Sequence, residues 1–239
     1  MNIIDTLKLL DTDLFLLING HHSAFFDGFM FAVSEKLAWI PLYASVLYIL
    51  IKHWKKEAIW LILSLILCIV ISDQVSSGIL KDLIKRLRPS HAEELKGMIH
   101  FVNGYTGGLY GFCSSHASNA FGFALLSSLI FNRKIFTYAI FAWAVITAYS
   151  RIYLGVHYPT DILGGVVVGT FSALICYWAI RRFKSSILVN KDSTLNKFDT
   201  LIPVIVLLIS YLVIIIYSIT SIYSNSVIEQ IVGFFLMIT

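Results

Sequence analysis

Long apolar runs separated by short polar connections set the pattern of this chain. The runs cover 37–51, 57–80, 117–132, 135–150, 162–180 and 200–228. A helix needs about 20 apolar residues to cross a bilayer core. Lipid cannot satisfy open backbone groups, so spanning segments are helices or closed barrels, and continuous apolar runs favour helices. The pattern predicts an all-α fold, a polytopic membrane helix bundle of about six transmembrane helices.

The first 36 residues mix large apolar side chains with acidic residues, asparagine and histidine. Such a mixture is typical of an amphipathic helix or helix pair lying at a membrane interface. A short extra span is the weaker alternative. The chain therefore divides into an interfacial segment 1–36, a core of five transmembrane helices 37–182, a cytoplasmic linker 183–199, and an extra C-terminal transmembrane helix and tail 200–239.

Composition supports a membrane protein and excludes other classes. Of 239 residues, 58% are hydrophobic and only 13% are charged, and the mean hydropathy is +0.81. Soluble domains carry about 25% charged residues. A disordered chain, a disulfide scaffold and a nucleic-acid partner are excluded on this ground. The three cysteines are expected to be unpaired.

The distribution of basic residues predicts the orientation. Ten of the 18 lysines and arginines fall in three connections that share one side: 52–56, 133–134 and 181–197. Basic short loops are typical of the cytoplasmic side. The opposite side carries 81–116 and 150–161, which also hold basic residues against the rule. An anionic ligand would explain them.

Three polar clusters lie on that non-cytoplasmic side. In the first, Lys81, Lys85 and Arg88 have spacings that place them on one helical face, with Pro89 stopping the helix just after Arg88. In the second, Ser114, Ser115 and His116 open the third span, where N-cap residues and free N–H groups favour anions. Taken alone, the first also fits a basic membrane flank, and His116 fits a structural histidine.

The third cluster bridges the fourth and fifth spans and holds Arg151, His157 and Asp161. Asp161 lies four residues after His157, within reach of the imidazole. A carboxylate on one ring nitrogen fixes the tautomer and leaves the other nitrogen available. A purely structural hydrogen bond is the alternative for this pair taken alone.

Together the clusters place two histidines, several cations and one orienting carboxylate on one membrane face. Phosphoryl transfer needs positioned groups and neutralised oxygen charge. One histidine could attack phosphorus while the other protonates the leaving oxygen. The sequence shows no carboxylate cluster that would hold magnesium. We therefore expect no metal and no other cofactor, with the cations neutralising the phosphate.

The clusters resemble the three signatures of the type 2 phosphatidic acid phosphatase (PAP2) superfamily, K-x6-R-P, P-S-G-H and S-R-x5-H-x3-D. The chain reads Lys81-x6-Arg88-Pro89, Cys113-Ser114-Ser115-His116 and Ser150-Arg151-x5-His157-x3-Asp161. The first and third match in full. In the second, Cys113 stands for proline and Ser115 for glycine. The resemblance covers about 37–182, and the N-terminal segment is similar to that of compact bacterial members.

The resemblance implies a role for each motif residue. His157 would be the nucleophile that forms a phosphohistidine, Asp161 would orient it, and His116 would be the general acid. The phosphate would be bound by the remaining motif residues: Lys81, Arg88, Arg151, Ser114 and Ser115.

The implied activity is metal-independent hydrolysis of a lipid-linked phosphate or diphosphate in the bacterial inner membrane, with the active site facing the periplasm or exterior. Undecaprenyl diphosphate and lipid A phosphate are the leading substrates, and phosphatidic acid or phosphatidylglycerol phosphate follows. The partners would be this lipid and the bilayer. The alternative is a non-catalytic membrane protein that binds anionic head groups. The glycine-rich loop 90–112 would be a substrate lid, and the remaining histidines, His22 and His100 among them, are expected to be interfacial or loop residues.

Overall fold

The computed structural model describes residues 3–189, 196 and 198–238, and in this part of the chain all regular elements are helical. Six helices follow the six apolar runs, which confirms the predicted all-α class. They are α3 (Ile40–Trp54), α4 (Ala58–Asp73), α6 (Ser115–Phe131), α7 (Lys134–Tyr153), α8 (Pro159–Phe183) and α11 (Leu201–Ile238). Four further α-helices lie outside these runs: α1 (Ile3–Gly20), α2 (Ala24–Ser34), α5 (Lys81–Ile84) and α9 (Ser185–Val189).

Four stretches of the described residues are long and apolar enough to cross a membrane. The first, Lys36–Ile84, contains both α3 and α4, and the others are α7, α8 and the described start of α11. Helix α6, with 17 residues, lies inside the bundle. Exposed leucine, isoleucine and valine side chains cover the outer faces of α4, α8 and α11, as a lipid environment requires.

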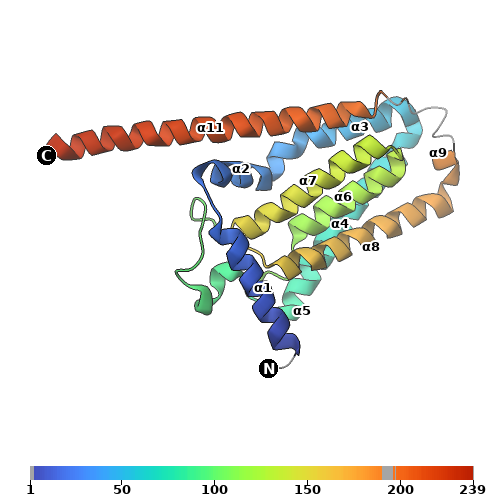
Figure 1. The fold of residues 1–239 in the computed structure, drawn as a ribbon. Helices are drawn as coiled ribbons and strands as arrows, with labels where there is room; N and C mark the ends of the chain where they lie inside the picture. Colours follow the sequence, from blue (N-terminus) through green and yellow to red (C-terminus); the bar gives the residue numbers. More distant parts are fainter. Residues whose placement is uncertain (1–2, 190–195, 197, 239) are drawn as a thin grey trace.

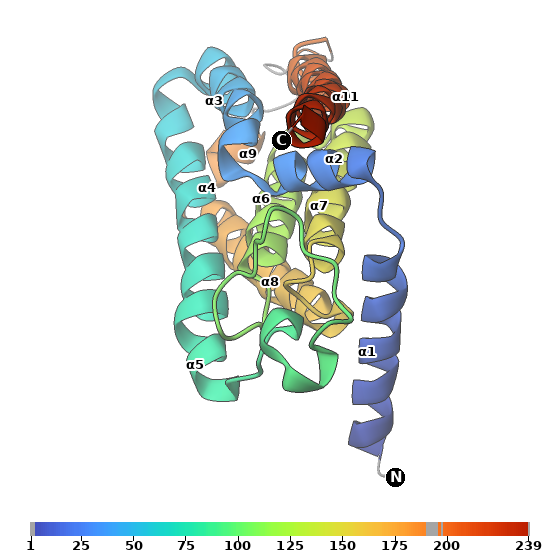
Figure 2. The ribbon, with the colours of Figure 1, turned by 90° about the vertical axis from the view of Figure 1, so that its left-hand side faces the viewer.

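The core helices α4, α6, α7 and α8 run side by side, and α11 lies beside α2 and α3 (Figure 1). The segment 1–36 forms a helix pair. Helix α2 crosses the bundle, whereas α1 runs along its side near the end covered by the loop 85–114 (Figure 2). The segment thus contains two helices, and their position at a membrane interface stays a prediction. The proposed linker 183–199 lies partly outside the described residues.

Helices α6 and α8 approach each other through glycine. A Cβ atom added to Gly169 would lie 2.2 Å from the backbone oxygen of Ser118, and one added to Gly165 would lie 2.5 Å from that of Ser114. Both distances are shorter than any real Cβ contact. The Gly-x3-Gly spacing of α8 therefore serves close helix packing, as expected for membrane helices.

Substituting Gly169 by alanine should destabilise the fold by about 1–3 kcal/mol, the usual cost of overpacking. The methyl group would meet backbone atoms of α6, which cannot rotate away. Thermal unfolding in detergent measures the change. Gly20→Ala is the matched control, because nothing lies within 4 Å of a Cβ added there. Equal melting temperatures for the two variants would contradict this account of the α6–α8 contact.

The basic connections and the motif residues lie at opposite ends of the bundle. The turns α3–α4 and α6–α7 and the end of α8 share one end, and the loops that hold the three motifs share the other (Figure 1). At the basic end, Asp199 accepts from Lys52 at 3.0 Å and contacts His53 at 2.7 Å, which ties α3 to the start of α11. The alternation of loop charge along the sequence thus matches a single basic face.

Candidate active site

The first motif departs from the predicted helix. We expected Lys81, Lys85 and Arg88 on one helical face, but α5 ends at Ile84 and Lys85 adopts the left-handed conformation with φ 50°. Four residues, 85–88, therefore lie between the end of the helix and Pro89. The following backbone pairs with another loop instead: Arg88 N donates to Leu109 O, and Gly111 N donates to Arg86 O. This extended segment turns Arg86 and Arg88 into the site.

Before α5, the residues Gln74–Leu80 form a π-helical segment that continues α4. Segments of this kind are rare in proteins, and those that occur often lie at functional sites. The segment leads directly into Lys81, whose Nζ donates to Ser77 Oγ at 3.3 Å. The predicted span 57–80 is thus helical throughout, with a local change of helix type beside the first motif residue.

The second motif begins α6 as an N-cap. Ser114 is fully buried, and its Oγ accepts from the N–H of Ala117 at 3.4 Å. Its own N–H donates to the backbone oxygen of Asp161 at 3.0 Å, which joins the second motif to the third. Ser115 is the first helical residue and His116 the second. The expected N-cap chemistry is observed, and His116 lies at the mouth of the helix.

The third motif forms the turn from α7 into α8. Pro159 is the first residue of α8, and the Asp161 carboxylate accepts from the N–H of Tyr158 at 3.0 Å, which caps the helix. The same oxygen, Oδ2, lies 3.3 Å from His157 Nδ1. Both side chains are almost completely buried. The predicted His157–Asp161 pair is therefore present.

Arg88 contacts the second ring nitrogen of His157, Nε2. Arg88 Nη1 lies 3.2 Å from His157 Nε2. An arginine can only donate, so Nε2 is the acceptor and Nδ1 carries the proton that faces Asp161. Burial lowers the pKa of His157 well below its usual 6.5, and the charges of Arg88, Arg151 and Lys81 lower it further. The imidazole is therefore neutral at neutral pH, with a lone pair on Nε2 directed toward the cations.

Arg151 lies in the same buried environment. Its Nη1 donates to Ser34 Oγ and its Nη2 donates to Tyr105 Oη at 2.8 Å, while its Nε is buried without a partner. The side chain is 2% exposed. His116 interacts electrostatically with Arg151, His157 and Arg88. The structure thus brings the charged residues of all three motifs together.

The site carries an excess of positive charge. Lys81, Arg88 and Arg151 surround His157, and the pKa of Arg88 is lowered by burial and by Arg151. The one motif carboxylate, Asp161, is shared with a further cation, because Arg86 Nη1 lies 3.2 Å from its Oδ1. A buried cluster with this balance of charge favours an anion. The arrangement can hold a phosphate against Nε2 of His157.

Arg86 was missed by the sequence analysis as a site residue. Besides Asp161, it contacts Asp11 of α1 at 2.7 Å, and its guanidinium lies 3.9 Å from the ring centre of Tyr158. Asp11 also accepts from the backbone N–H of Thr160 at 2.9 Å. The excess of basic residues on this face could have identified Arg86 as a site residue. No spacing pointed to Asp11, Ser34 or Tyr105, because their partners are more than 40 residues away.

The loop 90–112 is anchored on both sides. Gly111 allows a close approach, since a Cβ atom there would lie 2.8 Å from Asp161 Oδ2. On the other side, Asn19 of α1 bonds the backbone of His100 through both its oxygen and its nitrogen. These contacts fix the loop that carries Tyr105 to Arg151.

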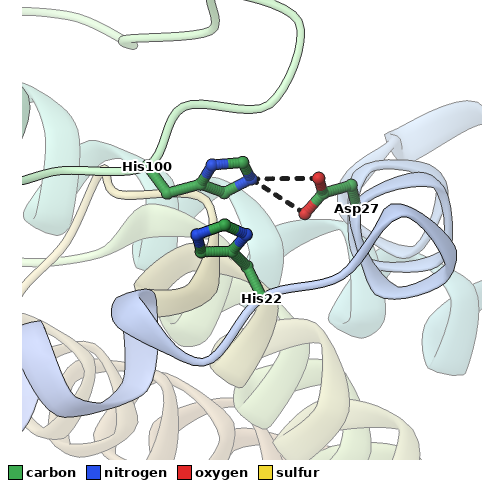
Figure 3. A group of neighbouring side chains, drawn as sticks. All are labelled: His22, Asp27 and His100. Carbon is green, nitrogen blue, oxygen red and sulfur yellow. Dashed lines mark hydrogen bonds and ion pairs between the residues drawn. The ribbon is translucent and has the colours of Figure 1, made fainter.

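A histidine cluster forms part of this anchor. His100 Nε2 lies 3.0 Å from both carboxylate oxygens of Asp27, and His22 stacks on His100 with ring centres 3.6 Å apart (Figure 3). Among the described residues, this is the one group of His, Cys, Asp or Glu side chains placed to hold a metal ion. It shares no residue with the three motifs. His22 and His100 are thus loop residues, as expected, but they are brought together.

The apolar helices indicate a membrane protein. The buried cations around a neutral histidine at one end of the bundle are typical of an enzyme that acts on phosphate. The model of the PAP2 superfamily matches residues 57–185. A lipid A 4'-phosphatase of Bacteroides thetaiotaomicron is 41% identical over 178 residues, 73% of this chain and 79% of the relative. The corresponding protein of Porphyromonas gingivalis is 39% identical over 66% of this chain and 68% of its own.

The crystal structure of Aquifex aeolicus LpxE is also similar, with a TM-score of 0.57 and 25% identity, over 71% of this chain and 95% of that one. The chain belongs to the PAP2 superfamily. It is a membrane phosphatase, as the named relatives show, and the alternative of a non-catalytic head-group binder is set aside.

Proposed function

We propose that this chain removes a phosphate from lipid A through a phosphohistidine on His157, without a metal ion. The observation that carries the proposal is the orientation of His157, whose Nδ1 faces Asp161 and whose Nε2 lone pair faces Arg88. The relatives named as lipid A 4'-phosphatases support this substrate over a prenyl diphosphate or a glycerol-based lipid phosphate.

In the proposed first step, Nε2 of His157 attacks phosphorus and the bond from phosphorus to the ester oxygen breaks. His116 enters this step protonated and donates its proton to that leaving oxygen, which becomes a free hydroxyl. Lys81, Arg88 and Arg151 bind the three phosphoryl oxygens, with the unpartnered Nε of Arg151 as one donor. Ser114 and the backbone N–H of Ser115 would complete the site at the N-terminus of α6.

In the second step, a water molecule attacks the phosphohistidine. His116, now neutral, accepts a proton from that water, and the bond from phosphorus to Nε2 breaks. Inorganic phosphate leaves and His157 is regenerated as the neutral imidazole. Asp161 holds the Nδ1 proton throughout, which keeps the same tautomer available in both steps.

We further propose that the motif end faces the periplasm and that the protein lies in the bacterial inner membrane. The basic connections at the other end support a cytoplasmic location for that end. The segment 37–182 would be the phosphatase core, with 1–36 at the interface and 200–239 as an extra helix and tail.

The test is a substrate panel with purified full-length protein in detergent, with EDTA present and inorganic phosphate as the readout. Lipid A, undecaprenyl diphosphate, phosphatidic acid and phosphatidylglycerol phosphate form the panel. Release from lipid A at the highest kcat/KM supports the proposal. Release only from another lipid rejects the substrate, and loss of activity with EDTA rejects the metal-free mechanism.

The pH profile tests the protonation state of His157. Only the neutral imidazole can attack, and burial with Arg88 holds its pKa well below 6.5. Protonation of His157 in the free enzyme therefore begins only at lower pH, and kcat/KM should not fall between neutral pH and pH 6.5. The profile is corrected for the titration of the substrate phosphate, measured by phosphorus NMR. A loss of half the activity by pH 6.5 would contradict the assignment.

A further inference from the structure

The cluster of His22, Asp27 and His100 has no role in the proposed phosphoryl transfer. Its side chains come from three segments: the connection between α1 and α2, the first turn of α2, and the loop 90–112. Each side chain offers one ligand atom, and these atoms lie within 4.8 Å of one another. In Figure 3 the two imidazole rings lie parallel beside the carboxylate. Imidazole and carboxylate groups are typical ligands of zinc.

Contacts around the cluster hold two of the three ligands in position. Tyr153 Oη donates to Asp27 Oδ1 at 2.7 Å and accepts from the N–H of Ser23 at 3.2 Å. The backbone of His100 is bound on both sides by the Asn19 side chain, at 2.8 and 2.9 Å. Partners of this kind orient metal ligands and increase the affinity for the metal. The carboxylate and the His100 ring are therefore positioned before an ion binds.

His22 is the adaptable third ligand. Its side chain is exposed, and its ring lies 3.6 Å from that of His100 with 4° between the planes. A ring nitrogen binds a metal in the plane of the ring, so the two rings must turn away from parallel. The ring torsion of histidine is broad, and the exposure of His22 leaves room for this rotation. Ligand atoms on tetrahedral zinc lie about 3.3 Å apart, so a small movement completes the site.

We propose that His22, Asp27 and His100 bind one zinc ion, which holds the loop 90–112 on the helix pair α1 and α2. His100 binds through the lone pair of Nε2 with its ring proton on Nδ1, and Asp27 binds through a carboxylate oxygen. The side chains of His100 and Asp27 are 25% and 23% exposed, so the ion can enter from solvent. The zinc is structural and takes no part in hydrolysis. Its removal by EDTA should lower the melting temperature and leave phosphate release unchanged while the protein stays folded.

The experiment titrates zinc chloride into purified full-length protein without a histidine tag and measures binding by calorimetry. We expect one zinc ion per chain. His22→Ala and Asp27→Asn should each weaken binding at least about 10-fold, because each removes a ligand, and Tyr153→Phe should weaken it about 10-fold by removing the donor to Asp27. Zinc at 100 times its Kd should raise the melting temperature of the wild type by about 5–10 °C and leave that of His22→Ala unchanged.

His21→Ala is the matched control, because the neighbouring His21 is also exposed but contacts the backbone oxygen of Leu17, outside the cluster. It should keep the affinity and the melting shift of the wild type. Equal zinc affinity of the wild type, His22→Ala and Asp27→Asn would mean an adventitious ion only and would reject the site, as would no zinc uptake by the wild type. Neither result depends on phosphate release, so the proposed function is tested separately.

Discussion

Replacing His157 by alanine should lower phosphate release from lipid A by at least about 10⁴-fold, because the substitution removes the proposed nucleophile. The buried Nε2, 3.2 Å from Arg88, has no substitute nearby. In the proposed mechanism His116 serves the leaving oxygen, and it lies on α6, whereas His157 lies in the turn before α8. Release of inorganic phosphate under single-turnover conditions measures the loss. Rapid acid quench of the wild type should also trap no labelled protein, whereas alkaline denaturation should preserve a phosphohistidine.

His53→Ala is the control for this variant. His53 lies at the opposite end of the bundle, on Asp199. It should keep wild-type phosphate release. If His157→Ala retained more than about one per cent of the wild-type rate, nucleophilic attack by His157 would be excluded.

Asp161→Asn should lower kcat about 10³-fold and also lower the melting temperature, because the ion pair of Asp161 with Arg86 is lost. The carboxylate orients His157 by accepting from Nδ1 at 3.3 Å, and a neutral amide can instead stabilise the wrong tautomer. The same carboxylate oxygen accepts from the Tyr158 N–H, so an amide nitrogen that turns toward His157 also gives up the cap of α8. Steady-state kinetics on lipid A, together with a thermal melt, separates the loss of rate from a loss of stability.

Asp199→Asn is the matched carboxylate control, because Asp199 pairs with Lys52 and His53 at the basic end. It should leave kcat unchanged. If Asp161→Asn raised KM and left kcat unchanged, Asp161 would serve substrate binding and would not orient the nucleophile.

The fold was predictable where hydrophobicity alone determines it. Six apolar runs gave six helices, and Gly165 and Gly169 gave the close contact of α8 with α6. The local course of the chain at 85–88 was not predictable. Lys85 leaves the helix because the backbone of Arg86 and Arg88 gains partners from Leu109 and Gly111, which lie more than 20 residues away. Tertiary pairing there overrides the helical spacing.

The same limit applies to the site. Short-range spacing predicted the contact of His157 with Asp161, since four residues separate them on one turn. Arg151 is held by Ser34 and Tyr105. These two residues come from separate segments and belong to no motif. Arg86 and Asp11 form a partly buried ion pair across 75 positions. Such supports become visible only once the helices are placed.

The glycine contact between α6 and α8 has a consequence for how such enzymes diversify. His116 lies on α6 and Asp161 lies on α8. The backbones of these helices are in contact at Ser118 and Gly169, with no side chain between them. The spacing of the two helices is therefore set by main-chain atoms that all amino acids share. Mutations elsewhere in the bundle can reshape the lipid-facing walls while the geometry for phosphoryl transfer is inherited unchanged. New lipid specificities can thus arise on an old chemistry.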